Sequence, residues 1–109
     1  MAHVEVKREG KSLFVRVLFP RIDGENFIVN AVKEKNLIAQ DIELVEIDLD
    51  AVEYLNSLGI TEFVNIHRMF TDITRGKTKF RFTNVDRKVK AILELVEVQK
   101  IAEIISKST

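Results

Sequence analysis

Apolar and polar positions alternate in the first part of the chain. Residues 4–7 (Val-Glu-Val-Lys) alternate strictly, Gly10-Lys11 supplies a turn, and residues 13–19 are rich in β-branched and aromatic side chains. This pattern predicts a β-hairpin within the first twenty residues. Pro20 closes its second strand.

A helical spacing follows the hairpin and begins at Asp23 or Gly24. Its apolar positions recur at intervals near three and four residues: Phe27 or Ile28, Ala31, Val32 and Leu37. Residues 42–49 then form a largely apolar run, which predicts an interior strand covered on both faces. Asp48 and Asp50 mark the end of that strand.

The longest helical pattern runs from Ile60 to about Arg75. One apolar stripe recurs at spacings of three, four and three residues: Phe63, Ile66, Phe70 and Ile73. Arg75-Gly76 is typical of a helix end, because glycine readily adopts the conformation that stops a helix.

The last third of the chain predicts one strand and two helices. Thr78, Phe80 and Phe82 alternate with basic residues, which indicates a strand with one buried face, near a sheet edge. Asn84 is the expected cap of a third helix, whose apolar positions run from Val85 to Val96. An apolar C-terminal helix is expected to follow, through Ile101, Ile104 and Ile105.

The predicted element order is therefore ββαβαβαα. Strands that alternate with helices after an initial hairpin imply an α/β fold, in which α-helices pack on a single layer of mixed, mostly parallel β-sheet. The 109 residues suit one domain spanning 1–109.

Composition excludes several classes of function. The net charge is zero, with 17 basic and 17 acidic residues, which argues against general nucleic-acid binding. No cysteine is present, so thiol catalysis and thiolate metal sites are excluded. The sequence contains no secretory signal and no apolar run of roughly 20 residues, so a cytoplasmic protein without membrane insertion is expected.

Charge is uneven along the chain. Residues 41–62 carry seven acidic residues and no Lys or Arg, whereas residues 75–90 are strongly basic. A dipolar surface would result if these segments lay on different sides of the molecule. Two solvated faces without a role in docking are the alternative.

Residues 56–59 (Asn-Ser-Leu-Gly) place a serine hydroxyl at the start of the long helical pattern. The first turn of a helix leaves backbone N–H groups unpaired and favours negative charge, so Ser57 suits either a plain N-cap or a phosphate. Gly59 is expected to let the helix start approach its surroundings closely. Leu58 is either an exposed anchor for a partner or a residue packed beneath the preceding loop.

Residues 44–105 resemble the STAS domain, a family named from sulfate transporters and anti-sigma-factor antagonists. Residues 45–49 resemble the family's strand ending in Asp-Leu, and residues 52–60 resemble its approach to an Asp-Ser-x-Gly-leucine signature. Residues 91–98 resemble its C-terminal Leu-Glu-Leu-x-Gly-Leu segment, which Ile101 and Ile104 continue. The first forty residues match in element order and length only. A STAS-like sheet of about four to five strands is implied.

The resemblance implies an anti-sigma-factor antagonist, a non-enzymatic regulator of bacterial transcription. Its implied partner is an anti-sigma factor with serine kinase activity, and the implied switch is phosphorylation of Ser57, which turns the antagonist off. The implied contact surface is formed by Asn56, Ser57, Leu58, Gly59, Thr61 and Glu62. No cofactor is implied, and a monomer or weak dimer is expected. The alternative is a STAS scaffold subunit of a transporter ATPase or a larger signalling complex, without phosphorylation.

Three positions differ from the family pattern. Asn56 replaces the signature acid, Leu58 replaces a frequent small residue, and Glu97 replaces a glycine. Loss of the carboxylate at position 56 either makes the loop a poorer kinase substrate or eases accommodation of a phosphate. The sequence leaves both possibilities open.

Other candidate sites have simpler explanations. His67 lies beside the apolar stripe and is expected to be a half-buried core histidine rather than a metal ligand or base. Asp48, Asp50 and Glu53 are interpreted as solvated strand-end residues. Residues 77–82 interleave basic and aromatic side chains as an RNA-binding strand would, but alternation assigns Phe80 and Phe82 to the core. No catalytic or metal-binding residue is predicted.

Overall fold

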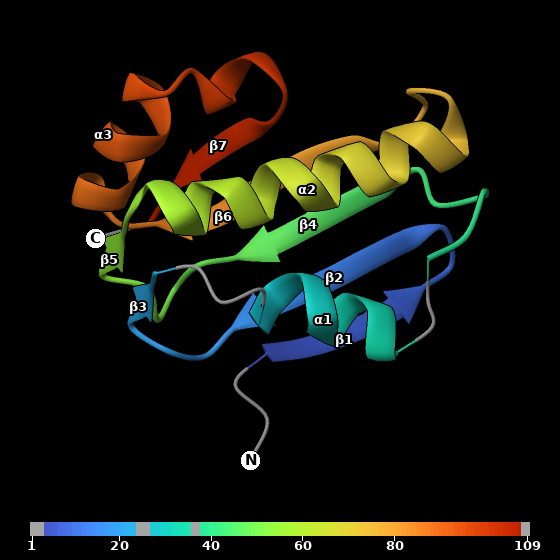
Figure 1. The fold of residues 1–109 in the computed structure, drawn as a ribbon, viewed down its shortest axis with the longest axis horizontal. Helices are drawn as coiled ribbons and strands as arrows, with labels where there is room; N and C mark the ends of the chain where they lie inside the picture. The colour runs from blue at the N-terminus through green and yellow to red at the C-terminus, as the bar shows by residue number, and fades with distance from the viewer. Residues whose placement is uncertain (1–3, 24–26, 36–37, 108–109) are drawn as a thin grey trace.

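The chain begins with the predicted hairpin, formed by β1 (Val4–Glu9) and β2 (Ser12–Val17). Gly10 turns the chain with φ +61°, a backbone conformation that glycine adopts without strain. The computed structural model describes residues 4–23, 27–35 and 38–107. Its elements are shown in Figure 1.

Within these residues, the main sheet has five strands in the order β1-β2-β4-β6-β7. β4 (Leu44–Asp48), β6 (Lys79–Val85) and β7 (Glu103–Ser106) run parallel to β2, and only β1 is antiparallel to its neighbour. The predicted α/β fold with a mixed, mostly parallel sheet is therefore confirmed.

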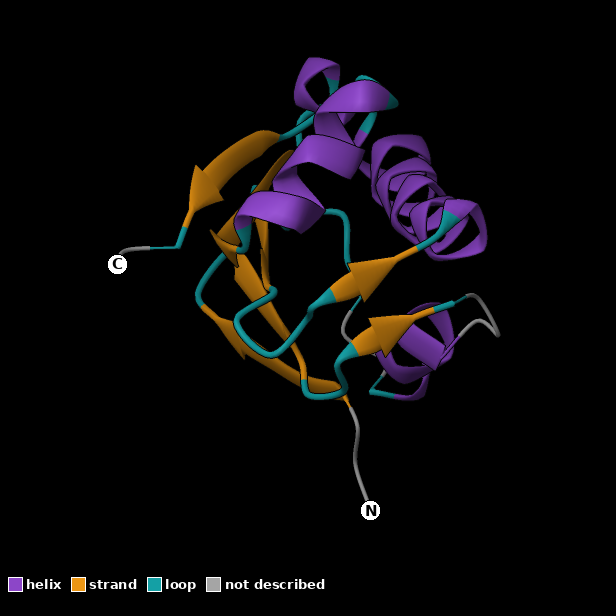
Figure 2. Cartoon of the chain, turned by 90° about the vertical axis from the view of Figure 1, so that its left-hand side faces the viewer, coloured by secondary structure: helices purple, strands orange, loops and turns teal. Residues whose placement is uncertain are grey.

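Three helices cover one face of this sheet, among the residues described: α1 (Phe27–Glu34), α2 (Ser57–Thr74) and α3 (Arg87–Leu95). Figure 2 shows the opposite face free of helices. The expectation that the strand at 42–49 is covered on both faces was therefore wrong. β4 buries Val45 and Ile47 against the helices, while Leu44, Glu46 and Asp48 on the other face are half-buried.

The core lies between the helices and the covered face of the sheet. Phe63 and Phe70 of α2 meet Phe82 and Phe80 of β6 edge to face, with ring centroids 4.9 and 6.0 Å apart. These contacts confirm the predicted apolar stripe, except that Ile73 is partly exposed. Helix α2 ends as predicted, because Arg75 adopts a left-handed conformation and its N–H bonds to the Thr71 carbonyl.

The first helix confirms the spacing after the hairpin, with Ile28 and Val32 buried. Gly24, one of the two expected start positions, and Leu37, expected on the apolar face, lie outside the described residues.

The C-terminal prediction needs correction in two places. Asn84 belongs to β6, and Asp86 caps α3 instead, accepting a hydrogen bond from the Lys88 N–H at 3.1 Å. The expected second C-terminal helix is a short 3₁₀ turn, η1 (Val98–Lys100), followed by strand β7. As a result, β6 lies inside the sheet and not near its edge.

A second, two-stranded sheet was not predicted. β3 (Arg21–Ile22) pairs in parallel with β5 (Tyr54–Leu55), and it fixes the segment that leads into α2. Each strand has two residues, which is too short to show a hydrophobic period.

Candidate functional site

The start of α2 is held in place by the segment that precedes it. The Pro20 carbonyl accepts hydrogen bonds from the N–H groups of Glu53 and Tyr54, at 2.8 and 3.0 Å. The Asn56 N–H donates to the Ile22 carbonyl at 3.2 Å. Backbone hydrogen bonds therefore hold the segment before α2 as far as residue 56, where the helix begins.

Asn56 is the N-cap of α2. Its backbone is extended, and its side-chain oxygen accepts a hydrogen bond from the Gly59 N–H at 3.0 Å. The Asn56 carbonyl accepts the first helical bond, from the Ile60 N–H. Asparagine is among the strongest N-cap residues. The interpretation of Ser57 as the cap is therefore wrong.

Ser57 is the first residue of the helix and is exposed. Within the described part of the chain, its hydroxyl makes no hydrogen bond, and neither the Ser57 nor the Leu58 N–H has an acceptor. These two amides belong to the group of donors that a helix leaves unpaired in its first turn. An oxyanion at this position would meet free donors and the positive end of the helix dipole.

Gly59 allows the close approach that its position predicts. A Cβ at this residue would lie 2.4 Å from the Ile22 carbonyl oxygen and 2.7 Å from the Leu55 Cδ1. The clash with a backbone atom cannot be relieved by a rotamer change. Glycine at this position is what lets the helix start pack against the β3–β5 pair.

Apolar and aromatic surface lies next to Ser57. Leu58 is 58% exposed, so the alternative that it packs beneath the loop is wrong. Tyr54 is 38% exposed, and the guanidinium carbon of Arg21 lies 4.2 Å from its ring centroid, a cation–π contact. Tyrosine and arginine are enriched among residues that carry interface binding energy. Sequence reasoning missed this pair because only the β3–β5 register brings it together.

Thr61 and Glu62, the other two expected contact residues, differ in their environment. Thr61 is exposed, and its hydroxyl donates to the Ser57 carbonyl at 3.0 Å. Glu62 is 1% exposed and faces α1, where Oε1 accepts a hydrogen bond from the Ile28 N–H at 3.0 Å. Glu62 therefore has no surface to offer a partner, contrary to its expected role. It acts instead as a cap for α1, supplied from α2.

Burial raises the pKa of the Glu62 carboxyl above its ordinary value, and the negative charge of Asp23 raises it further. Hydrogen bonds from the backbone amides of Ile28 and Val29 act in the opposite direction and lower this pKa. Its second oxygen, Oε2, has no hydrogen-bond partner among the described residues. The carboxylate therefore lies in an environment that penalises its charge.

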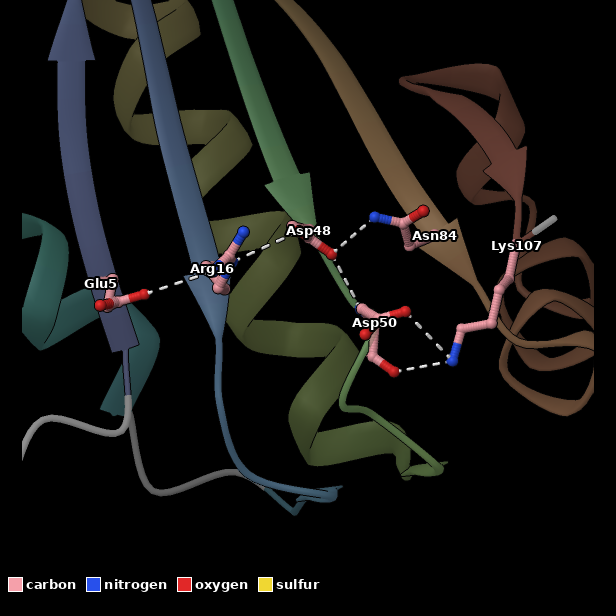
Figure 3. Close-up of polar contacts among 6 residues, drawn as sticks. All are labelled: Glu5, Arg16, Asp48, Asp50, Asn84 and Lys107. Atoms are coloured by element: carbon pink, nitrogen blue, oxygen red, sulfur yellow. Dashed lines mark hydrogen bonds and ion pairs between the residues drawn. The ribbon is translucent and has the colours of Figure 1, made fainter.

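The carboxylates at the strand ends are occupied by structural contacts (Figure 3). Asp48 pairs with Arg16 at 3.5 Å and accepts hydrogen bonds from the Asn84 side chain and the Asp50 N–H. Asp50 pairs with Lys107 at 3.4 Å. Glu53 is exposed. The described residues contain no group of three or more His, Asp or Glu side chains suited to a metal ion.

The remaining candidates also have core or surface roles. His67 is half-buried with its ring 4.9 Å from that of Phe80, and burial lowers its pKa. Phe80 and Phe82 are 5% and 2% exposed, as alternation predicts, so neither ring can stack on a nucleic-acid base.

The acidic and basic segments meet in the main sheet. The acidic segment contains β4 and the basic segment contains β6, and these two strands are neighbours in the sheet. The Arg81 guanidinium lies 3.3 Å from the Glu46 carboxylate. The condition for the dipole, that the two segments lie on different sides, is not met by these strands.

None of the described helices has the length and apolar character needed to cross a membrane. Comparison with curated proteins gives no match by sequence. Solved structures share the fold at low identity. An anti-sigma-factor antagonist (STAS) domain protein from Planctomyces limnophilus gives a TM-score of 0.73 at 20% identity, covering 99% of this chain and 92% of that one.

Two further structures agree. An anti-sigma factor antagonist from Mycobacterium paratuberculosis gives a TM-score of 0.69 at 19% identity, with 94% of this chain and 83% of that chain covered. The anti-sigma factor antagonist SpoIIAA in its unphosphorylated form gives 0.63 at 10% identity, with 97% and 89% covered. The family model of the STAS domain matches residues 8–108. The chain therefore belongs to the STAS domain family.

Proposed function

We propose that this protein is an anti-sigma-factor antagonist that binds an anti-sigma factor through the surface around the start of α2. The contact residues are Asn56, Ser57, Leu58 and Thr61, whereas Gly59 is buried and supports this surface by letting α2 pack against the β3–β5 pair. Tyr54 and Arg21 extend this surface, because they lie on the strand pair that leads into the helix. The partner has serine kinase activity, and phosphorylation of Ser57 dissociates the complex.

The observation that carries the proposal is the exposed hydroxyl of Ser57, which Asn56 releases from capping. In the proposed reaction, the Ser57 oxygen forms a bond to the γ-phosphorus of ATP and the bond to ADP breaks. The hydroxyl proton passes to a base of the kinase.

A phosphate on Ser57 adds about 1.5 to 2 negative charges at neutral pH. The unpaired N–H groups of Ser57 and Leu58 and the helix dipole favour that charge, so the antagonist itself remains folded. A partner packed on Leu58 would bury the same charge away from water, which costs binding free energy unless a cation pairs with it. A modification of one residue thereby weakens the complex without unfolding the protein.

The modification is tested by incubating the full chain with ATP and the serine-kinase anti-sigma factor of its source organism, followed by intact-mass measurement. One added phosphate is expected for the wild type and none for Ser57→Ala. Ser106→Ala is the matched control, since it removes an exposed hydroxyl on β7, outside the contact surface, and should still accept one phosphate.

An unmodified wild type would contradict the switch. If the native protein also co-purified with a transporter ATPase or a membrane complex, the scaffold alternative would replace it.

A further inference from the structure

We propose that two copies of this chain associate through β7, in antiparallel register centred on Ile105. β7 is an edge of the main sheet, because β6 pairs with one of its sides and no other described strand pairs with the other. Figure 2 shows its outer side uncovered. An unpaired strand edge is a template for pairing with another chain.

The two edges of the sheet differ in their protection. β1, the opposite edge, carries charges at four of its six positions: Glu5, Lys7, Arg8 and Glu9. Charged side chains on an edge strand discourage pairing. β7 has a single charged residue, Glu103, beside Ile104 and Ile105, and Ile105 is 40% exposed. The unprotected edge is therefore β7.

The backbone of β7 suits this register. The Lys107 N–H donates to the Val85 carbonyl of β6 at 2.9 Å. Because successive amides of a strand point to opposite sides, the N–H and C=O groups of Ser106 and Ile104 point away from β6. In a two-fold pair centred on Ile105, Ile104 of one copy faces Ser106 of the other, and these are the residues with free groups.

The side chains complement one another in the same register. Glu103 faces Lys107 of the second copy, twice by symmetry, and the two Ile105 side chains meet at the axis. Glu103 already pairs with Arg81 at 2.9 Å, and Lys107 pairs with Asp50 at 3.4 Å. The contact across the axis joins these two ion pairs into one network. The short strand predicts a weak dimer that forms at high protein concentration.

Sedimentation velocity of the full chain over a wide concentration range tests the proposal. The wild type should shift from monomer towards dimer as concentration rises, and Ile105→Lys should remain monomeric at every concentration. Ile105 is partly exposed, so circular dichroism should show the variant folded like the wild type. Glu9→Lys, on the protected edge, is the control and should dimerise like the wild type.

Charge exchange tests the register. Glu103→Lys places like charges opposite one another and should weaken association, whereas Glu103→Lys combined with Lys107→Glu restores opposite charges and should recover it. A wild type that stays monomeric would overturn the proposal, and so would a double variant without recovery. Assemblies that grow beyond the dimer would indicate pairing of β7 with β1 instead. None of these outcomes bears on the proposed phosphorylation of Ser57, because β7 is not part of that site.

Discussion

The Asn56 side chain accepts the Gly59 N–H at 3.0 Å and thereby caps α2, which leaves the neighbouring Ser57 hydroxyl exposed and unbonded within the described residues. Asn56 and Ser57 are both good N-cap residues, and the extended backbone at Asn56 makes this residue the cap. The Ser57 hydroxyl is then available for phosphorylation. This division of roles depends on the helix beginning at Ser57.

Asn56→Ala should destabilise the fold by about 0.5–2 kcal/mol, because it removes the cap of α2. Asn56→Asp is the matched control, since aspartate caps as well as asparagine does, and it should stay close to the wild type. Urea unfolding followed by circular dichroism measures both. Equal stability of Asn56→Ala and Asn56→Asp would show that the observed hydrogen bond contributes nothing.

Gly59→Ala should cost roughly 1–3 kcal/mol, because the added methyl group would lie 2.4 Å from the Ile22 carbonyl oxygen. Gly10→Asn is the control. Gly10 has open space around its Cβ position, and asparagine tolerates its left-handed conformation. A thermal melt should separate the two variants, and a Gly59→Ala melt matching the wild type would argue against tight packing of α2 on β3.

Glu62 predicts a pH dependence of stability. Burial raises its folded-state pKa above the ordinary value of 4.5, so the folded protein holds this proton more tightly than the unfolded chain. Both states are protonated well below 4.5, where no penalty exists. As pH rises through 4.5 and past the folded-state pKa, ionisation costs stability.

Glu62→Gln removes this titration while keeping an oxygen that can accept the Ile28 N–H. Its free energy of unfolding relative to the wild type should therefore increase between pH 4 and pH 7.5, measured by urea unfolding at each pH. Glu62→Ala should also speed hydrogen exchange at Ile28, since that amide loses its acceptor. A difference that does not vary with pH would rule out the buried ionisation.

Much of the fold could be predicted because its signals are local. The hairpin and α2 follow from alternation and from a stripe at helical spacing, and both are confirmed. β7 was mistaken for a helix because Ile101, Ile104 and Ile105 also recur at three and four residues, a spacing that cannot separate a short strand from a helix.

The site was predictable only in part. A serine at a helix start can be found from the sequence, but the choice between Asn56 and Ser57 as cap depends on backbone angles. The burial of Glu62 depends on Ile28, 34 residues earlier, and the Arg21–Tyr54 contact depends on the β3–β5 register. Such long-range partners leave no periodic signal.

Leu58→Ala should weaken binding to the anti-sigma factor by at least about 1 kcal/mol, the range of residues that matter in interfaces, with little change in stability. Ile73→Ala is the control on the same helix. Ile73 is also a partly exposed apolar residue, and it lies 15 residues further along the helix, about 22 Å from Leu58. Titration calorimetry compares the two, and equal affinities would place the contact surface elsewhere.

In the proposed switch, a phosphate on Ser57 releases the anti-sigma factor. The most direct measurement is the dissociation constant of the complex with the anti-sigma factor, determined for the unmodified chain and for the chain fully phosphorylated at Ser57, in the absence of ATP. Phosphorylation should lower the affinity by at least about tenfold, or about 1.4 kcal/mol, while circular dichroism shows an unchanged fold. Equal dissociation constants for the two forms would contradict it.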